Sequence, residues 1–332
     1  MENEIKEQEV NEQEEVIEEQ PSPETEEVSE PVAPITYSSD YLQKIEDARA
    51  SFLKVYRTQN SFKWVVSAIC IAAVVFACIF IPQLIEGTGG TVAMVSILVG
   101  ALAGTLCYSI FTKKSMEKKM KAYFGLYYDC VNHFVFDNEN ISNLKSQFPG
   151  KIEKEVFTDN NLFKDVNEVG SRGLSEFEYK GIPIAICDAA AQTVVERRAV
   201  PVFVGKYLYS AANFDYDDPV YIYFRGDKRS LPPTNMDGIK AVLDDKKMIV
   251  YSNNKDWKKV LTPEVKKIFS KIEMNKELVD LSISFQKGRM FVCMGYDDPL
   301  MVLPLQHQFD PKPNEQFKRD VYNILDLIKE FN

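Results

Sequence analysis

The chain has 332 residues, six cysteines and a formal net charge of −10, which is distributed unevenly. Residues 1–35 contain thirteen glutamates and one lysine, a net of −12, which leaves +2 for the remainder. No basic stripe with interleaved aromatic residues follows, which excludes nucleic acid as a partner. No pair of cysteines has CxxC spacing, which excludes a disulfide framework or a zinc pattern.

The N-terminal segment is rich in glutamate, punctuated by proline and poor in aromatic residues. Such a composition cannot bury enough apolar surface to fold, so we expect residues 1–37 to form a disordered acidic tail. Solvation of the chain is one role for this tail, and docking to a basic protein partner is the alternative. The segment lacks the basic start and apolar core of a signal peptide.

Two uncharged apolar runs follow, at residues 64–85 and 91–111. Each has about the 20 residues that a helix needs to cross a bilayer. The five residues between them, "EGTGG", allow only a tight turn, so the runs predict a transmembrane hairpin. Lysine and arginine flank both runs and are absent from the turn, which predicts that both flanks are cytoplasmic. The expected location is therefore the plasma membrane, in a multi-pass topology with both termini inside and the lipid bilayer as a partner.

Small residues recur at every fourth position of the two runs, a spacing that lets helix backbones approach closely. We expect them to pack within the hairpin, and homodimerisation is the alternative. The residues are Ser96, Gly100 and Gly104 in the second run and Ala68 and Ala72 in the first.

Apolar stripes with helical spacing flank the hairpin. The stripe before it contains Ile45 and Phe52, and the stripe after it contains Tyr123. These stripes predict juxtamembrane helices over residues 38–63 and 112–134, which either pair as a short stalk or lie on the anionic inner leaflet.

From about residue 135 to residue 332 the pattern predicts a cytoplasmic α+β domain. Runs rich in Val, Tyr and Phe predict strands, with hairpins at Lys180-Gly181 and at "QKG", residues 286–288. Thr262 and Pro263 predict the start of a helix, as N-cap and first helical residue. The closing stretch "NEQFKRDVYNILDLIKEF" predicts an amphipathic helix.

The order of these segments resembles a known bacterial family. "FVFDNENI" precedes a strand-rich middle, then "MIVYSNNKDWKKVLTPEVKKIFSKI" and "ISFQKGRMFVCM" follow. The chain is similar, over about residues 40–332, to Domain of Unknown Function family three-one-three-seven, most closely at residues 250–252 and 261–269. The resemblance implies a bacterial membrane protein of unestablished activity, and it supplies no catalytic residue.

The sequence contains no recognisable catalytic or cofactor motif, so neither a catalytic residue nor a cofactor is predicted. His133 and His307 have no HxxxH partner, and Cys187 and Cys293 lie in apolar runs where inert burial is expected.

The word "YDDP" occurs twice, at residues 216–219 and 296–299. Adjacent carboxylates could hold a hard cation, but Asp-Pro between strands is also good turn chemistry. We expect hairpin turns, with a metal site as the alternative. The candidate metal ligands are Asp217, Asp218, Asp297 and Asp298.

These observations predict a membrane-anchored cytoplasmic binding or scaffold module that has a protein partner. The alternative is an inner-leaflet sensor or enzyme that uses the YDDP carboxylates for a small ligand or a metal.

Overall fold

The structure, a computed structural model, describes residues 39–84, 88–213, 218–226, 231–275, 277–296 and 312–332. Some helical side chains, most of them between residues 62 and 112, lie outside this description. The predicted acidic tail, residues 1–37, and the position of His307 fall outside the described residues.

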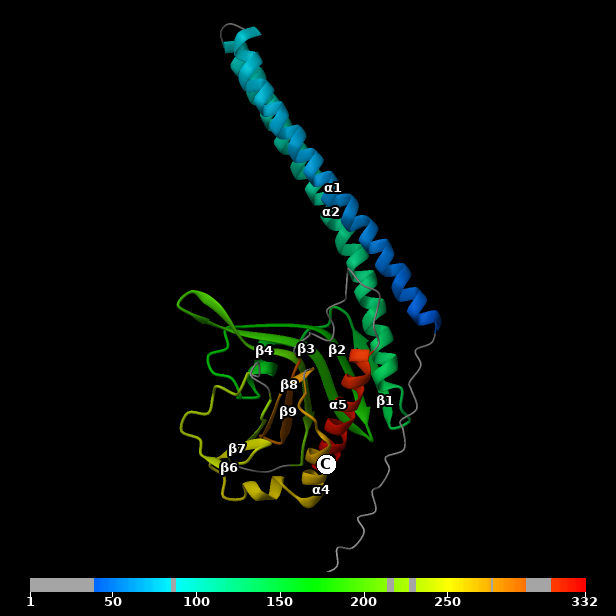
Figure 1. The fold of residues 1–332 in the computed structure, drawn as a ribbon, viewed down its shortest axis with the longest axis vertical. Helices are drawn as coiled ribbons and strands as arrows, with labels where there is room; N and C mark the ends of the chain where they lie inside the picture. Colours follow the sequence, from blue (N-terminus) through cyan, green and yellow to red (C-terminus); the bar gives the residue numbers. More distant parts are fainter. Residues whose placement is uncertain (1–38, 85–87, 214–217, 227–230, 276, 297–311) are drawn as a thin grey trace, which may run out of the picture. The chain divides into compact units, whose positions relative to one another are not determined.

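Two long helices, α1 (Ser39–Leu84) and α2 (Thr88–Phe136), lie side by side and run antiparallel (Figure 1). The Phe52 ring of α1 stacks on the Tyr123 ring of α2, with the centroids 6.2 Å apart. Ile45, Phe52 and Tyr123 are all buried. The apolar stripes expected before the first apolar run and after the second therefore pack against each other.

No helix in the described part of the chain has both the length and the apolar character needed to cross a bilayer. The predictions of transmembrane helices at residues 64–85 and 91–111, of a multi-pass topology and of a plasma-membrane location are therefore wrong. Each apolar run is one part of a longer helix that also carries exposed lysines such as Lys54 and Lys118. Several large apolar side chains of the pair remain exposed, namely Trp64, Ile71, Val75, Val95 and Ile110.

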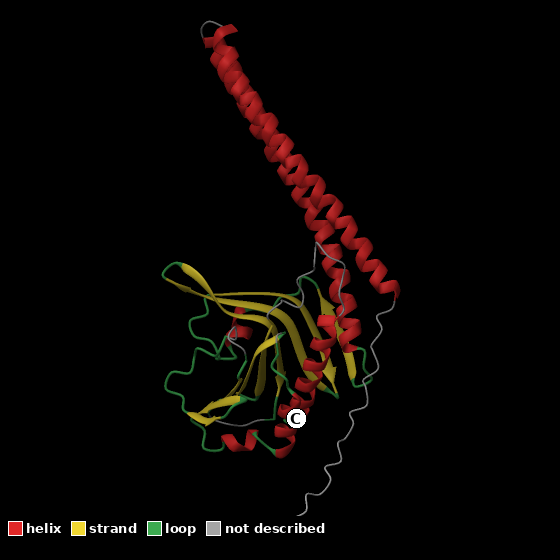
Figure 2. Ribbon diagram, in the orientation of Figure 1, coloured by secondary structure: helices red, strands yellow, loops and turns green. Residues whose placement is uncertain are grey.

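Among the described residues, the strands, yellow in Figure 2, belong to one antiparallel sheet. This sheet has nine described strands, in the order β1-β2-β3-β4-β9-β8-β5-β7-β6. The predicted fold class, an α+β domain behind a transmembrane hairpin, is wrong, because one large sheet with few helices dominates. The strands are β1 (Ile141–Gln147), β2 (Glu168–Tyr179), β3 (Ile182–Val195), β4 (Arg198–Ala211), β5 (Val220–Phe224), β6 (Ala241–Asp244), β7 (Met248–Ser252), β8 (Leu278–Gln286) and β9 (Arg289–Tyr296).

Tight two-residue turns connect three pairs of neighbouring strands. Lys180–Gly181, Glu196–Arg197 and Lys287–Gly288 have positive φ at both residues, which matches the twist of antiparallel strands. The hairpin predicted at Lys180–Gly181 is confirmed. The turn at Lys287–Gly288 is one residue shorter than expected, because β8 extends through Gln286.

Two apolar cores lie on the two faces of the sheet. One face packs with α1, α2, α4 (Pro263–Lys271) and α5 (Lys312–Lys329). The other packs with α3 (Lys154–Thr158) and the loops around it. A single turn of 3₁₀ helix, Trp257–Val260, precedes α4.

The predicted start of α4 is confirmed. The Thr262 hydroxyl accepts a hydrogen bond from the Val265 amide at 3.2 Å, and Pro263 is the first helical residue. Val265 and Phe269 are buried, so their face of α4 packs into the core.

Candidate functional site

The register of three neighbouring strands brings together opposite charges from distant parts of the sequence. Arg172 of β2 pairs with Asp188 of β3, and Asp188 pairs with Lys206 of β4. Directly opposed residues in an antiparallel pair point to the same face. The three side chains therefore lie next to one another on the face that packs against α2 and α5.

Asp188 is the centre of this cluster. Its Oδ1 forms an ion pair with Lys206 Nζ, and its Oδ2 lies 3.6 Å from Arg172 Nε. The Tyr128 hydroxyl of α2 donates a hydrogen bond to Oδ2. The Lys206 side chain is only 4% exposed, whereas that of Arg172 is 38% exposed. The cluster thus runs from the buried interior toward solvent.

Burial and the neighbouring charge have opposite effects on the pKa of Lys206. Removal from water lowers the pKa of the Lys206 amine, and the Asp188 carboxylate raises it, with a net lowering. Burial also raises the pKa of Tyr128, with a further contribution from the Asp188 charge, so the phenol remains a hydrogen-bond donor. Lys206 Nζ lies 4.8 Å from the centroid of the Phe317 ring of α5, a further favourable contact for a cation.

A cavity of about 310 Å³ adjoins the cluster, and we call it the Lys206 cavity. Its volume is at the lower end of the range for small-molecule sites. Most of the other residues that line this cavity are glycine, alanine or serine, whose side chains are small. The lining residues are Gly170–Arg172, Asp188–Ala190, Val204–Lys206 and Tyr296.

A second buried acid, Asp320 of α5, contacts Tyr296 of the cavity wall. The Tyr296 hydroxyl donates to Asp320 Oδ2 at 2.9 Å, and Gln316 Nε2 donates to Asp320 Oδ1 at 2.8 Å. Burial raises the pKa of Asp320 to about 6, against the effect of these hydrogen bonds. The hydrogen bond between Tyr296 and Asp320 joins the end of β9 to α5. Contacts between a strand and a helix therefore hold this wall of the cavity in place.

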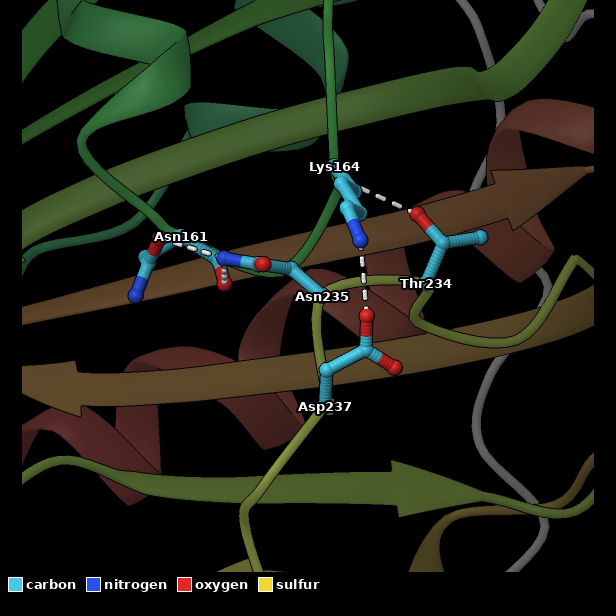
Figure 3. Close-up of polar contacts among 5 residues, drawn as sticks. All are labelled: Asn161, Lys164, Thr234, Asn235 and Asp237. Carbon is cyan, nitrogen blue, oxygen red and sulfur yellow. Dashed lines mark hydrogen bonds and ion pairs between the residues drawn. The ribbon is translucent and has the colours of Figure 1, made fainter.

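A separate polar cluster joins the loop after α3 to the loop before β6 (Figure 3). Lys164 Nζ pairs with Asp237 Oδ2 at 2.7 Å, and the Lys164 amide donates to Thr234 Oγ1 at 2.9 Å. Asn235 Nδ2 donates to Asn161 Oδ1 at 2.6 Å. The Lys164 and Asp237 side chains are mostly exposed, and exposed ion pairs contribute little. We therefore interpret this cluster as a clasp between loops.

The candidate metal ligands of the YDDP motifs fall mostly outside the described residues. Asp217, Asp297 and Asp298 lie outside the described residues, and Asp218 is exposed. Among the described residues, no group of three or more His, Cys, Asp or Glu side chains could hold a metal ion.

The two YDDP motifs also differ in their described flanks. Val220, which follows the first motif, pairs with Phe285 of β8, and Phe285 pairs with Met290 near the start of β9. Tyr296, which begins the second motif, is the last residue of β9. The described flanks of the motifs therefore lie at opposite ends of the strands. The strands before and after the first motif, β4 and β5, are not neighbours in the sheet. The hairpin turn predicted for the first motif is therefore wrong.

The small residues predicted to pack between helices are largely exposed where the structure describes them. Ala68, Ala72 and Gly100 are exposed, and the side-chain positions of Ser96 and Gly104 are outside the description. A Cβ added to Gly100 would meet nothing within 4 Å. These three positions do not line the contact between α1 and α2.

The remaining predicted residues behave as ordinary structural residues. Cys187 and Cys293 are free and buried, as expected. His133 is exposed on α2, with Nε2 3.6 Å from Asp129 Oδ1.

Sequence reasoning missed the Lys206 cluster, although two signals for it are visible. Asp188 follows the apolar run "IAIC", and Lys206 stands within "VPVFVGKYLY", so each charge sits in a stretch that otherwise predicts a buried strand. A charged residue in such a stretch predicts a neighbouring residue of opposite charge. Only the register of β3 and β4 identifies that partner.

Comparison with known proteins adds little. No family model matches the sequence, and no curated protein matches it. Among solved structures, the chain is similar to the crystal structure of the mycobacterial trehalose monomycolate transport factor A, TtfA, with 12% sequence identity and a TM-score of 0.34. The similarity covers 59% of this chain and 91% of that chain. A likeness this distant carries no argument about function.

Proposed function

We propose that the protein is a binding module that holds a small anionic ligand in the Lys206 cavity. The observation that carries the proposal is the buried ion pair of Lys206 and Asp188 at the cavity wall. A buried ion pair gives little net stability compared with apolar side chains of similar volume. Its position beside a cavity therefore favours a role in binding.

The charges of the lining indicate the sign of the ligand. Arg172 and Lys206 are cations and Asp188 is an anion, so the charged side chains of the lining sum to one positive charge. A charge held away from water is stabilised by an opposite charge. A ligand with one negative charge complements this lining, and the half-exposed Arg172 side chain is placed where such a ligand would enter.

Thermal denaturation of the full chain in phosphate, acetate or chloride at equal ionic strength tests this proposal. A ligand present at a hundred times its Kd stabilises by about 2.7 kcal/mol, which raises the Tm measurably. We expect the shift with phosphate or acetate to be lost in Arg172→Gln and Lys206→Met. The Arg172 variant keeps the test informative if the buried Lys206 variant fails to fold.

The matched control removes a charge far from the cavity. Lys266 is exposed on α4, and Lys266→Gln is expected to retain the full shift. An equal Tm shift in the parent and in all three variants would overturn the proposal.

Two predictions from the sequence stay proposals. A protein partner would suit a binding module, but no described contact identifies one. The resemblance to Domain of Unknown Function family three-one-three-seven also stays a proposal, and no activity follows from it.

A further inference from the structure

The hairpin of β3 and β4 extends beyond the strands beside it (Figure 1). β2 pairs with β3 only up to Gln192, and β9 pairs with β4 only from Gly205 onward. Within the described sheet, residues 193–195 therefore pair only with β4, and residues 198–204 pair only with β3. One face of this hairpin leads into the Lys206 cavity.

Alternate residues of a strand share a face, and opposed residues of paired strands share it too. From the ion pair outward, every second residue of β3 and its partner on β4 form a row, which we call the β3–β4 track. Its members are the pairs Asp188–Lys206, Ala190–Val204, Gln192–Pro201 and Val194–Ala199. The six residue steps from Asp188 to Val194 in extended chain make the track about 20 Å long.

The track is apolar beyond the ion pair, apart from Gln192, and it is open to solvent. Val194 is 49% exposed and Val204 is 38% exposed. Ala190, Ala199 and Pro201 are also exposed. Because Ala190 and Val204 also line the cavity, the apolar surface and the charged cluster are continuous.

We propose that the ligand of the Lys206 cavity is a single-chain amphiphile with one negative charge, an inference that rests on the proposed function. The anionic head lies at Arg172 and Lys206, and the apolar chain lies along the β3–β4 track. The track is one pair of strands wide, so it accommodates one chain. An extended peptide fits less well, because it would need backbone hydrogen bonds from β4, where Pro201 has no donor.

Calorimetric titration of the full chain with propionate, octanoate and dodecanoate, each below its micelle concentration, tests the inference. Each methylene removed from water increases affinity by about twofold to fourfold. We expect dodecanoate to bind at least about tenfold more tightly than octanoate. Dodecyltrimethylammonium, with the opposite charge, is expected not to bind.

Two variants, one on each face of the hairpin, test where the apolar chain of the ligand lies. Val194→Asp introduces a charge on the track and is expected to weaken dodecanoate binding about tenfold, more than it weakens propionate binding. Val200 is similarly exposed, at 42%, but pairs with Thr193 on the opposite face. Val200→Asp is therefore the matched control and is expected to leave the affinity for dodecanoate unchanged.

The outcomes separate this inference from the proposed function. If the three carboxylates bind with equal affinity and Arg172→Gln abolishes their binding, the ligand is not an amphiphile. The proposed anion site would still stand. Equal weakening of dodecanoate binding by Val194→Asp and Val200→Asp would overturn the track. Absence of binding by all three carboxylates would overturn both proposals.

Discussion

Lys206 and Asp188 carry opposite charges within the sheet, where neither side chain is more than 15% exposed. Loss of one partner leaves the other charge without compensation away from water. The Asp188 carboxylate would still accept the hydrogen bond of Tyr128 and lie near Arg172, which offsets only part of the loss.

We predict that Lys206→Met lowers the free energy of unfolding by about 3–5 kcal/mol, the usual cost of breaking a buried pair. The double variant Lys206→Met/Asp188→Leu removes both charges and is expected to recover most of that loss. Urea denaturation measures both changes. A double variant as unstable as the single one would contradict this account of the pair.

Asp280 of β8 is a further buried acid. Its Oδ2 accepts a hydrogen bond from the Leu231 amide at 3.3 Å, and its Oδ1 has no hydrogen-bond partner among the described residues. A Cβ on Gly295 of the neighbouring strand would overlap this carboxyl group, so the glycine makes room for it. Burial raises the pKa of Asp280 from 3.8 to about 7.

We predict a loss of stability with rising pH that comes from Asp280. The folded state holds the Asp280 proton more tightly than the unfolded state, so the contribution is fully present below about pH 4 and is lost as the pH rises through about 7. The free energy of unfolding, measured in urea at pH 5 and pH 8, should fall more in the parent than in Asp280→Asn. Equal changes in the two proteins would show that Asp280 titrates normally.

At the scale of single elements, Gly173 seats α2 on the sheet. Its φ of +66° lies in the left-handed region, and an added Cβ would overlap the ring of Tyr128. Tyr128 also reaches Asp188, so this glycine lets α2 approach the charged cluster.

We predict that Gly173→Ala lowers the free energy of unfolding by about 2 kcal/mol or more, from backbone strain and overlap together. Gly170 lies in the same strand with a negative φ, and the nearest atom to its added Cβ is 3.9 Å away. Gly170→Ala is therefore the matched control and should change stability little. Denaturation in urea compares the two, and equal effects would contradict the seating of Tyr128.

The cap of α4 gives a second test at this scale. Thr262→Ala removes the acceptor for the Val265 amide and is expected to cost about 1 kcal/mol, whereas Thr262→Ser keeps it. Thermal denaturation measures the difference. Equal Tm values for the two variants would contradict the cap.

Elements with local signals were predictable from the sequence. The Lys180–Gly181 turn needs residues that adopt positive φ, and Thr262-Pro263 marks a helix start by its own chemistry. The YDDP motifs were not predictable in the same way. Asp-Pro indicates a turn, but it does not say whether the strands on either side are neighbours, and β4 and β5 are separated by β9 and β8.

At the scale of the whole molecule, the main error concerns the two apolar runs. Length and hydropathy are shared by segments that cross a bilayer and by segments that pack against protein. The prediction of two spans used those two properties of residues 64–85 and 91–111, and the topology followed from the short turn and the flanking lysines and arginines. The structure places residues 64–84 and 91–111 within one antiparallel helix pair, α1 and α2.

The candidate site was unpredictable for a related reason. Lys206 and Asp188 are 18 residues apart, and their contact depends on a bulge that changes the register between β3 and β4 near Ala191. A one-residue difference in that register would turn one side chain to the other face. The charges were visible in the sequence, but their pairing belongs to the assembled sheet.

The most direct test of the central claim, that the Lys206 cavity binds an anion, is a titration of the isotope-labelled full chain with propionate, followed through backbone amide chemical shifts. The account predicts saturable changes concentrated at Ser171, Asp188–Ala190 and Gly205–Lys206, which are absent in Arg172→Gln. Changes confined to the Lys164–Asp237 clasp, or no changes at all, would contradict it.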